Sequence, residues 1–297
     1  MKNLATLTIL LAGSLLPTSA QEAGSSVYSD RNTKPREPQV NTGVLTGQIE
    51  PNKQVQFIES SVLMNVPAES YVAVFGFVQE GPVPAASNAT VNARFADFVK
   101  LLDVIGIKRD DVYIDYIAQN RVFDYTDTGT TVTEKLTGFE TKKNIAVRYK
   151  DPKLLERILG AAGHATIFDL IQVDYVVGDT KTIRARLFEE ATKIVKQKEA
   201  LYKGSLGLGL TAGAVANEKY DVFFPGERYQ SYQAFESGAA YSAYNKTVIR
   251  PRKVTTFYYD PVSGGAFDTV INPIGIEPMV QFTLYLRVQY SLPETKK

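Results

Sequence analysis

The sequence has no cysteine, no tryptophan and a single histidine, His164, among its 297 residues. The absence of cysteine excludes disulfides, thiol nucleophiles, thiolate zinc sites and iron–sulfur clusters. A metal site or catalytic triad that uses histidine would have to be built around His164 alone. We therefore predict a protein without metal or other cofactors, whose core is held together by packing alone.

The chain also lacks an excess of charge of either sign. Its 33 basic and 32 acidic residues give a formal net charge of +1. Since no global field favours nucleic acid or an anionic surface, we expect no nucleic-acid partner. After residue 20 no stretch approaches the length of apolar sequence that spans a bilayer, so we also expect no transmembrane segment.

The two ends of the chain have compositions typical of segments outside a folded domain. A short positive region precedes an apolar stretch from Leu4 to Leu16, and small residues up to Ala20 suit a cleavage site. This pattern predicts a signal peptide over residues 1–20 and a periplasmic or secreted protein. Residues 21–52 predict a flexible N-terminal arm, and residues 291–297 a polar tail.

Residues 53–290 carry the periodic apolar patterns of one domain, beginning with a short strand near Val55. From Tyr71 to Val177 the predicted order is β-α-β-β-α-β, which is the ferredoxin-like arrangement. A long helix capped by Asp179 or Thr180 follows, and then C-terminal antiparallel strands that end with residues 279–290. The predicted fold class is therefore α+β.

The stretch from Thr137 to Asp151 predicts the return strand of a long hairpin. Alternation places Ile145, Val147 and Tyr149 on the core face, and we expect Lys143 at an exposed or rim position. The Thr- and Gly-rich residues 124–138 before it predict the tip of this hairpin.

Asp151-Pro152 is expected to cap the helix that follows, and His164 to lie just past its C-terminus. Helical spacing predicts that Leu159 of this helix and Leu201 of the long helix face the core.

Three short motifs resemble functional signatures, and each fits a structural role better. Residues 127–130 spell Asp-Thr-Gly-Thr, but aspartic proteases need a second such carboxylate, and Asp268-Thr269 is not followed by glycine. Residues 207–213 are glycine-rich but follow a helix, the reverse of a dinucleotide fingerprint, so they predict a helix stop. Residues 124–135 fail as a calcium loop because Lys135 stands where a bidentate glutamate belongs.

The segment from Asn217 to Tyr259 is rich in aromatic residues. Eleven of its 43 residues are Tyr or Phe, against 11% in the whole chain. Two interpretations remain open: a flap packed on its own domain, or an insertion that forms an interface, since Tyr offers a large amphipathic contact area. The predicted interaction surface comprises Tyr220, Phe223, Phe224, Tyr229, Tyr232, Tyr241, Tyr244, Tyr258 and Tyr259.

The pattern of turns and apolar positions resembles the SIMPL family of bacterial envelope proteins. The resemblance rests on residues 138–141 (GFET), 151–155 (DPKLL), Gly163, 185–191 (ARLFEEA) and the final strand. Membership implies a periplasmic or secreted α+β protein that tends to oligomerise, and it implies no established catalytic residues.

These observations together predict a non-catalytic structural or interaction protein that forms homo-oligomers, with an envelope protein or surface as a further partner. The alternative is a cofactor-free cell-envelope hydrolase that uses carboxylates. A cluster of buried Asp or Glu in a deep pocket would favour the hydrolase. An exposed aromatic surface or an unpaired strand edge would favour the interaction protein.

Overall fold

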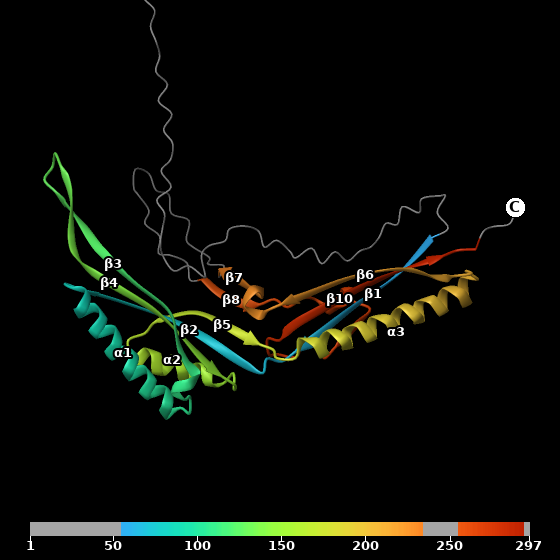
Figure 1. The fold of residues 1–297 in the computed structure, drawn as a ribbon, viewed down its shortest axis with the longest axis horizontal. Helices are drawn as coiled ribbons and strands as arrows, with labels where there is room; N and C mark the ends of the chain where they lie inside the picture. The colour runs from blue at the N-terminus through green and yellow to red at the C-terminus, as the bar shows by residue number, and fades with distance from the viewer. Residues whose placement is uncertain (1–54, 234–254, 294–297) are drawn as a thin grey trace, which may run out of the picture. The chain divides into compact units, whose positions relative to one another are not determined.

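The computed structural model describes residues 55–233 and 255–293 (Figure 1). The predicted signal peptide, the predicted arm, and Tyr241 and Tyr244 lie outside the described residues. The described residues form an α+β fold with three α-helices and several largely antiparallel sheets, which confirms the predicted fold class.

The first sheet has the strand order β3-β4-β2-β5, and every neighbouring pair in it is antiparallel. Helices α1 and α2 pack on one face of this sheet, where they enclose the first hydrophobic core. The elements are β2 (Ser70–Gly81), α1 (Pro84–Val104), β3 (Val112–Asp127), β4 (Val132–Tyr149), α2 (Leu154–His164) and β5 (Asp169–Val176).

Aromatic side chains dominate the first core. The Phe98 ring of α1 meets the Phe75 and Phe77 rings of β2 edge-on, with centroids 5.6 and 6.3 Å apart. Edge-to-face contacts of this kind stabilise a core beyond the burial of their area. From β4, Ile145 and Val147 enter the same core and are fully buried, as their alternation in the sequence predicts.

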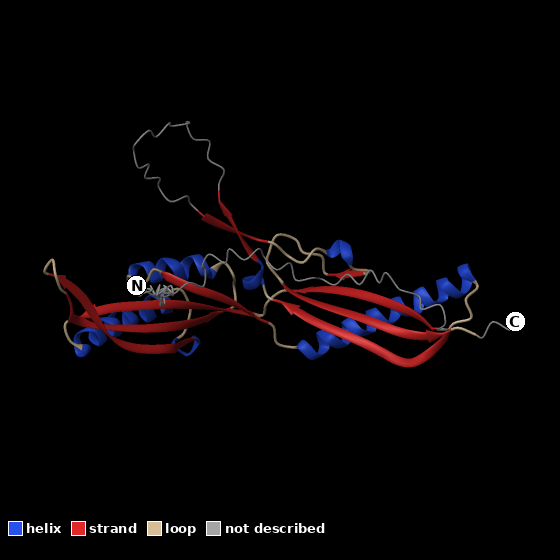
Figure 2. Ribbon diagram, turned by 90° about the horizontal axis from the view of Figure 1, so that it is seen from above, coloured by secondary structure: helices blue, strands red, loops and turns tan. Residues whose placement is uncertain are grey.

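The second sheet has the order β6-β10-β1-β9, and α3 packs along one face of its strands (Figure 2). Its elements are β1 (Val55–Val66), α3 (Thr180–Leu206), β6 (Thr211–Phe223), β9 (Thr269–Ile271) and β10 (Val280–Ser291). The strand at Val55 is thus twelve residues long, and its full length pairs with β10. Sequence analysis predicted it too short because its first half alternates apolar residues with glutamine.

The ends of α3 follow the capping rules. The Asp179 carboxylate accepts a hydrogen bond of 3.0 Å from the Thr182 backbone N–H, and Gly207 ends the helix with φ of 63°. Both the predicted cap and the predicted helix stop are confirmed, because only glycine adopts the left-handed conformation without steric cost. The prediction for Leu201 is wrong: its side chain is 59% exposed, since it lies near the C-terminal end of α3.

Helix α2 begins two residues later than predicted. The Asp151 carboxylate accepts a hydrogen bond from the Lys153 N–H, in a turn that precedes the helix. His164 is the last residue of the helix rather than the first beyond it, and it is exposed. Leu159 is 41% exposed, so its predicted core position is also wrong: the buried residues of α2 are Ile158, Ala161 and Ala162.

Two predictions for the β3–β4 hairpin require correction. The hairpin ladder continues to the pair Asp127–Val132, so the tip is limited to residues 128–131 instead of 124–138. Lys143 is only 7% exposed and is not a rim residue. It has the same alternation as Ile145 and Val147, and its stem lies under α1 while its ammonium donates to Asn92 Oδ1 at 2.6 Å.

A short ribbon, β7 (Tyr229–Gln233) and β8 (Thr255–Tyr259), forms the third sheet. The chain after β8 covers the face of the second sheet that α3 leaves open. There the fully buried Gln281 amide accepts a hydrogen bond from the Val262 N–H and donates one to Asn65 Oδ1. These bonds satisfy an amide that would otherwise be costly to bury.

Candidate interaction surface

The far half of the β3–β4 hairpin extends beyond the residues that α1 and α2 cover. Near the helices, Val112 pairs with Val147 and Ile114 with Ile145, and these residues belong to the first core. Beyond Gln119, β3 has no residue in either described core. The ladder nevertheless continues with cross-strand pairs as far as Asp127 (Figure 1).

One face of this far half carries four large apolar side chains together with the carboxylates of Asp127 and Glu134. Phe123 pairs directly with Leu136, and both side chains are 44% exposed. Tyr125 and Val132 lie on the same face by alternation and are 67% and 61% exposed. We call Phe123, Tyr125, Val132 and Leu136 the hairpin face.

The opposite face of the same segment is polar. It carries the pairs Asp124–Lys135 and Thr126–Thr133. Strands that alternate apolar and polar residues are typical of sheets with one covered and one solvated face. The hairpin face therefore has the pattern of a covered surface, although no described residue packs over it.

Strand β3 is also an edge strand, since only β4 pairs with it among the described residues. Near its start an extra residue, Asp115, interrupts the ladder between the pairs at Ile114 and Tyr116. Charged residues and bulges on an edge disfavour continuous pairing with another strand. An association at this hairpin would accordingly use its side-chain faces more than its backbone edge.

The structure divides the interaction surface predicted from the sequence between two environments. Tyr220, Phe223 and Tyr259 are half-buried: Tyr220 lies 6.2 Å from the Phe282 ring, and the Tyr259 hydroxyl donates to the Met279 carbonyl at 3.1 Å. The exposed members of the set are Phe224 (40%), Tyr229 (40%), Tyr232 (52%) and Tyr258 (53%). Tyr241 and Tyr244 lie outside the described residues.

The aromatic segment is not one insertion in space. Residues 217–223 belong to β6 and pair with β10, so they form part of the second sheet. The exposed tyrosines Tyr232 and Tyr258 lie on one face of the β7–β8 ribbon. The sequence suggested a single surface because aromatic density does not distinguish a core strand from an exposed ribbon.

Sequence analysis missed the hairpin face, although its signal was present. Phe123 and Tyr125 alternate with Asp124 and Thr126, which is the pattern of a half-covered strand. The Thr and Gly content of residues 124–138 instead predicted that all of them form the tip of the hairpin. Thr is in fact a good strand residue.

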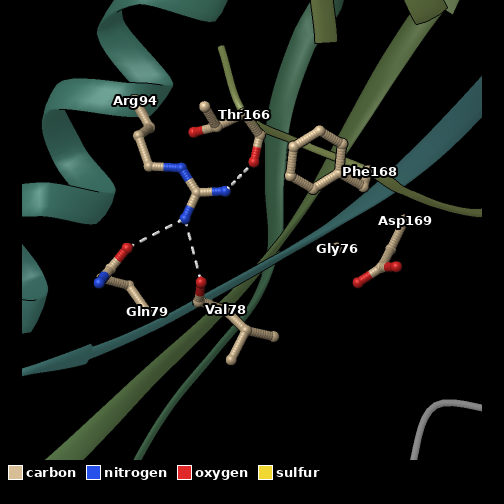
Figure 3. A pocket seen from close by; sticks show the side chains of 7 residues that line it. All are labelled: Gly76, Val78, Gln79, Arg94, Thr166, Phe168 and Asp169. Atoms are coloured by element: carbon tan, nitrogen blue, oxygen red, sulfur yellow. Dashed lines mark hydrogen bonds between the residues drawn. The ribbon is translucent and has the colours of Figure 1, made fainter. Parts of the chain in front are cut away.

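The pocket around Arg94 of α1 is a candidate for binding or chemistry (Figure 3). It has a volume of about 380 Å³ and is lined by Gly76, Val78, Gln79, Arg94, Thr166, Phe168 and Asp169. The guanidinium donates to the carbonyls of Val78, Ala165 and Thr166 and to Gln79 Oε1. Burial lowers the pKa of Arg94 from its ordinary value.

These bonds assign Arg94 a structural role. They tie the strand β2 to the turn after α2, where Thr166 has a positive φ of 59°. Because the carbonyls occupy the donors that an anion would use, the pocket is poorly suited to phosphate or carboxylate ligands.

Residues 61–256 match the family model SIMPL, described as a protein of unknown function (DUF541). The chain belongs to the SIMPL family. The match includes the first sheet with its helices, α3, β6 and β7, and it ends at residue 256 within β8; it confirms the resemblance found in the sequence. No curated protein matches the chain.

In the described part of the chain, no three His, Cys, Asp or Glu side chains are close enough together to hold a metal ion. The buried polar residues described are Ser60, Asn65, Ser87, Thr141, Lys143, Gln281 and Thr283, and they include no Asp or Glu. Hydrogen bonds from Thr182 and Lys203 lower the pKa values of Asp179 and Glu199, respectively, which stabilises their ionised forms.

Within the described ranges, this SIMPL protein has no helix with the length and apolar character to cross a membrane.

Proposed function

We propose that this SIMPL protein is a non-catalytic interaction protein that self-associates through the β3–β4 hairpin. The observation that carries the proposal is the hairpin face. Four large apolar side chains lie on one side of an extended two-stranded ribbon, and each is at least 44% exposed. Contiguous exposed apolar surface of this kind is uncommon on monomers and is typical of interaction sites.

A second copy of the chain is the partner that best fits this surface. Two acidic residues share the side of the hairpin face, Glu134 opposite Tyr125 and Asp127 opposite Val132, and both are exposed. A twofold axis would let two such faces cover each other, with these exposed carboxylates at the solvated rim of the contact. The experiment below distinguishes self-association from a contact with a different envelope protein.

The non-catalytic part of the proposal rests on the carboxylates. The hydrolase alternative needs Asp or Glu in a buried site where their pKa values can be raised. The buried polar residues that the structure describes offer no carboxylate for this purpose. The donors of Arg94 are likewise occupied by backbone carbonyls and an amide.

We further propose that the β2–β5 subdomain is ferredoxin-like and that the protein acts in the periplasm or outside the cell. The sheet order β3-β4-β2-β5, with both helices on one face, supports the first of these. The signal-peptide pattern of residues 1–20 supports the second. Fractionation of cells that express the full chain, with sequencing of the N-terminus of the exported form, would test this location.

The experiment for self-association is light scattering after size exclusion. A monomer has a mass of 32.8 kDa before any cleavage, and we expect the purified protein to have a multiple of the monomer mass. The triple variant Phe123→Ser, Tyr125→Ser, Leu136→Ser should have a lower mass with an unchanged circular dichroism spectrum. The control is Phe188→Ser on α3, which removes another exposed aromatic residue (45%) and should leave the mass unchanged.

The wild-type protein could prove monomeric while a hairpin peptide captures a different envelope protein. This result would show that the hairpin binds another protein and not a second copy. A triple variant that keeps the wild-type mass would contradict the proposal.

A further inference from the structure

A second pocket lies away from the hairpin, where the start of α2 meets the chain before β10. It has a volume of about 380 Å³, which is within the range of small-molecule sites. Its apolar walls include Leu155 and Pro278, together with the ring of Tyr175. Walls of this kind suit the hydrocarbon part of a ligand.

The polar groups in this pocket are acceptors more than donors. The carboxylates of Glu156 and Glu277 line it, and neither has a hydrogen bond or ion pair with any residue that the structure describes. Lys153 also lines the pocket and forms no ion pair with either carboxylate. One unit of negative charge is therefore left over among the lining residues.

Tyr71 adds an independent indication of a ligand. Its side chain is 9% exposed and lines the pocket, but its hydroxyl has no hydrogen-bond partner among the described residues. Its ring is held by Tyr149, stacked at 5.4 Å, and by Tyr175, edge-on at 5.2 Å. The hydroxyl is thus fixed in place without a protein partner and lies at the accessible wall of the pocket, where a ligand can reach it.

The surroundings of this hydroxyl are negative. Burial raises the pKa of Tyr71 most, and the nearby carboxylates of Glu277 and Asp151 raise it further. The Tyr71 phenol oxygen and the two carboxylates can all accept hydrogen bonds. A ligand whose polar group only donates hydrogen bonds would therefore match them.

We propose that this pocket binds an organic cation, a primary ammonium or guanidinium group on a short hydrocarbon stem. The charged head would donate to Glu277, Glu156 and the Tyr71 oxygen, and the stem would lie against Leu155, Pro278 and Tyr175. The site involves no residue of the hairpin face, so its existence does not depend on self-association.

The test compares three probes that share a stem and differ in the head group: n-butylamine, n-butanol and n-butanoate at pH 7. Binding to the full-length protein is measured by titration, with NMR shifts of the tyrosine side chains as the readout. We expect n-butylamine to bind more tightly than n-butanol, and n-butanoate not to bind.

Two variants locate the site. Glu277→Gln should weaken n-butylamine binding about fivefold, which is the value of one partly exposed charge pair. Tyr71→Phe should weaken it as well, by removal of one acceptor. The matched control Glu227→Gln removes an exposed carboxylate in the turn after β6 and should leave the affinity unchanged. Glu277 is exposed, so its variant should fold as the wild type does.

Equal binding of n-butylamine and n-butanoate, or no binding of n-butylamine at all, would overturn the proposal. Unaltered affinity in Glu277→Gln would overturn it too, because the amine would then be bound elsewhere.

Discussion

The near and far halves of the β3–β4 hairpin have the same alternation of side chains between two faces, but their environments are opposite. In the near half, Ile145 and Val147 of β4 are completely buried beneath the two helices. In the far half, Leu136 and Val132 of the same strand are 44% and 61% exposed. Alternation therefore shows that a face is suited to burial, but it does not show what buries it.

The difference lies in the length of the helical cover. Helix α1 has 21 residues and rises about 1.5 Å per residue, whereas a strand rises about 3.3 Å per residue. Strands of 16 and 18 residues are therefore longer than the helix that packs on them. The apolar residues beyond the end of the helix need another cover, and we propose a second copy.

The largest expected effect comes from the near half. Val147→Asp places an unpaired carboxylate in the first core, which should cost several kcal/mol and approach the total stability of a domain, about 5–15 kcal/mol. The variant should lack a cooperative thermal transition by circular dichroism. Tyr125→Asp, the same kind of change in the far half, should melt close to the wild-type temperature when both proteins are dilute enough to be monomeric. If both variants unfold, the two halves do not differ as proposed.

Alkaline pH should also separate core tyrosines from hairpin tyrosines. Burial raises the pKa of Tyr149 above its ordinary value of 10.0, and burial together with Glu199 raises that of Tyr290 to about 12. The folded state thus retains these protons when the unfolded chain has begun to lose them. Their contribution to stability is complete below pH 10 and is lost as the pH rises through the higher folded-state values.

Thermal melts from pH 9 to pH 12 should accordingly show a fall in stability that begins near pH 10. Tyr149→Phe should reduce this fall, because it removes one of the groups responsible. Tyr125→Phe serves as the control for an exposed ring and should follow the wild-type curve. A wild-type melting temperature that is constant up to pH 12 would contradict the prediction.

Lys143 marks the boundary between the two halves and should have an intermediate effect. Its hydrocarbon stem is buried, and its ammonium is bonded to Asn92 at the surface of α1. Lys143→Ala removes the packed stem and should cost about 1–2 kcal/mol. Lys143→Met keeps most of the stem and should cost less.

Urea unfolding of the two Lys143 variants at pH 7 would measure the difference. A loss of less than about 0.5 kcal/mol in the free energy of unfolding for Lys143→Ala is typical of an exposed residue. This result would support the rim position expected from the sequence.

The smallest effect on stability is expected at the hairpin face. Leu136→Ser should change the free energy of unfolding of the isolated chain by less than about 0.5 kcal/mol, because its side chain packs on neither described core. Urea unfolding at low protein concentration would show this. A loss of several kcal/mol would mean that the far half is part of the core of one chain.

Much of the fold could be predicted from local signals. The α+β class, the cap at Asp179, the stop at Gly207 and the core positions Ile145 and Val147 all depend on residues close together in the sequence. The exposure of Leu159 and Leu201 could not be predicted, since helical spacing gives a face but not the extent of the sheet opposite it. The exposure of the hairpin face depends on how far α1 extends along the hairpin, and no local sequence pattern predicts this.

The site was predicted less well than the fold, for a related reason. Aromatic density drew attention to residues 217–259, where Tyr220 proved to pack against Phe282 and Tyr258 to be exposed. The hairpin face has fewer aromatic residues and lies in a segment whose Thr and Gly content suggested a loop. Composition measures what a segment contains, whereas exposure depends on its neighbours.

The most direct test of the hairpin as the contact between copies uses the absence of cysteine in the chain. The variant Thr133→Cys introduces one labelling site on the polar side of the hairpin, where a spin label would leave the hairpin face intact. Dipolar spectroscopy then measures distances between labels on different copies. We predict a narrow distance distribution that disappears when Phe123→Ser, Tyr125→Ser and Leu136→Ser are added. Light scattering could show an oligomer whose dipolar signal has no defined distance. This result would place the contact elsewhere and contradict the proposal.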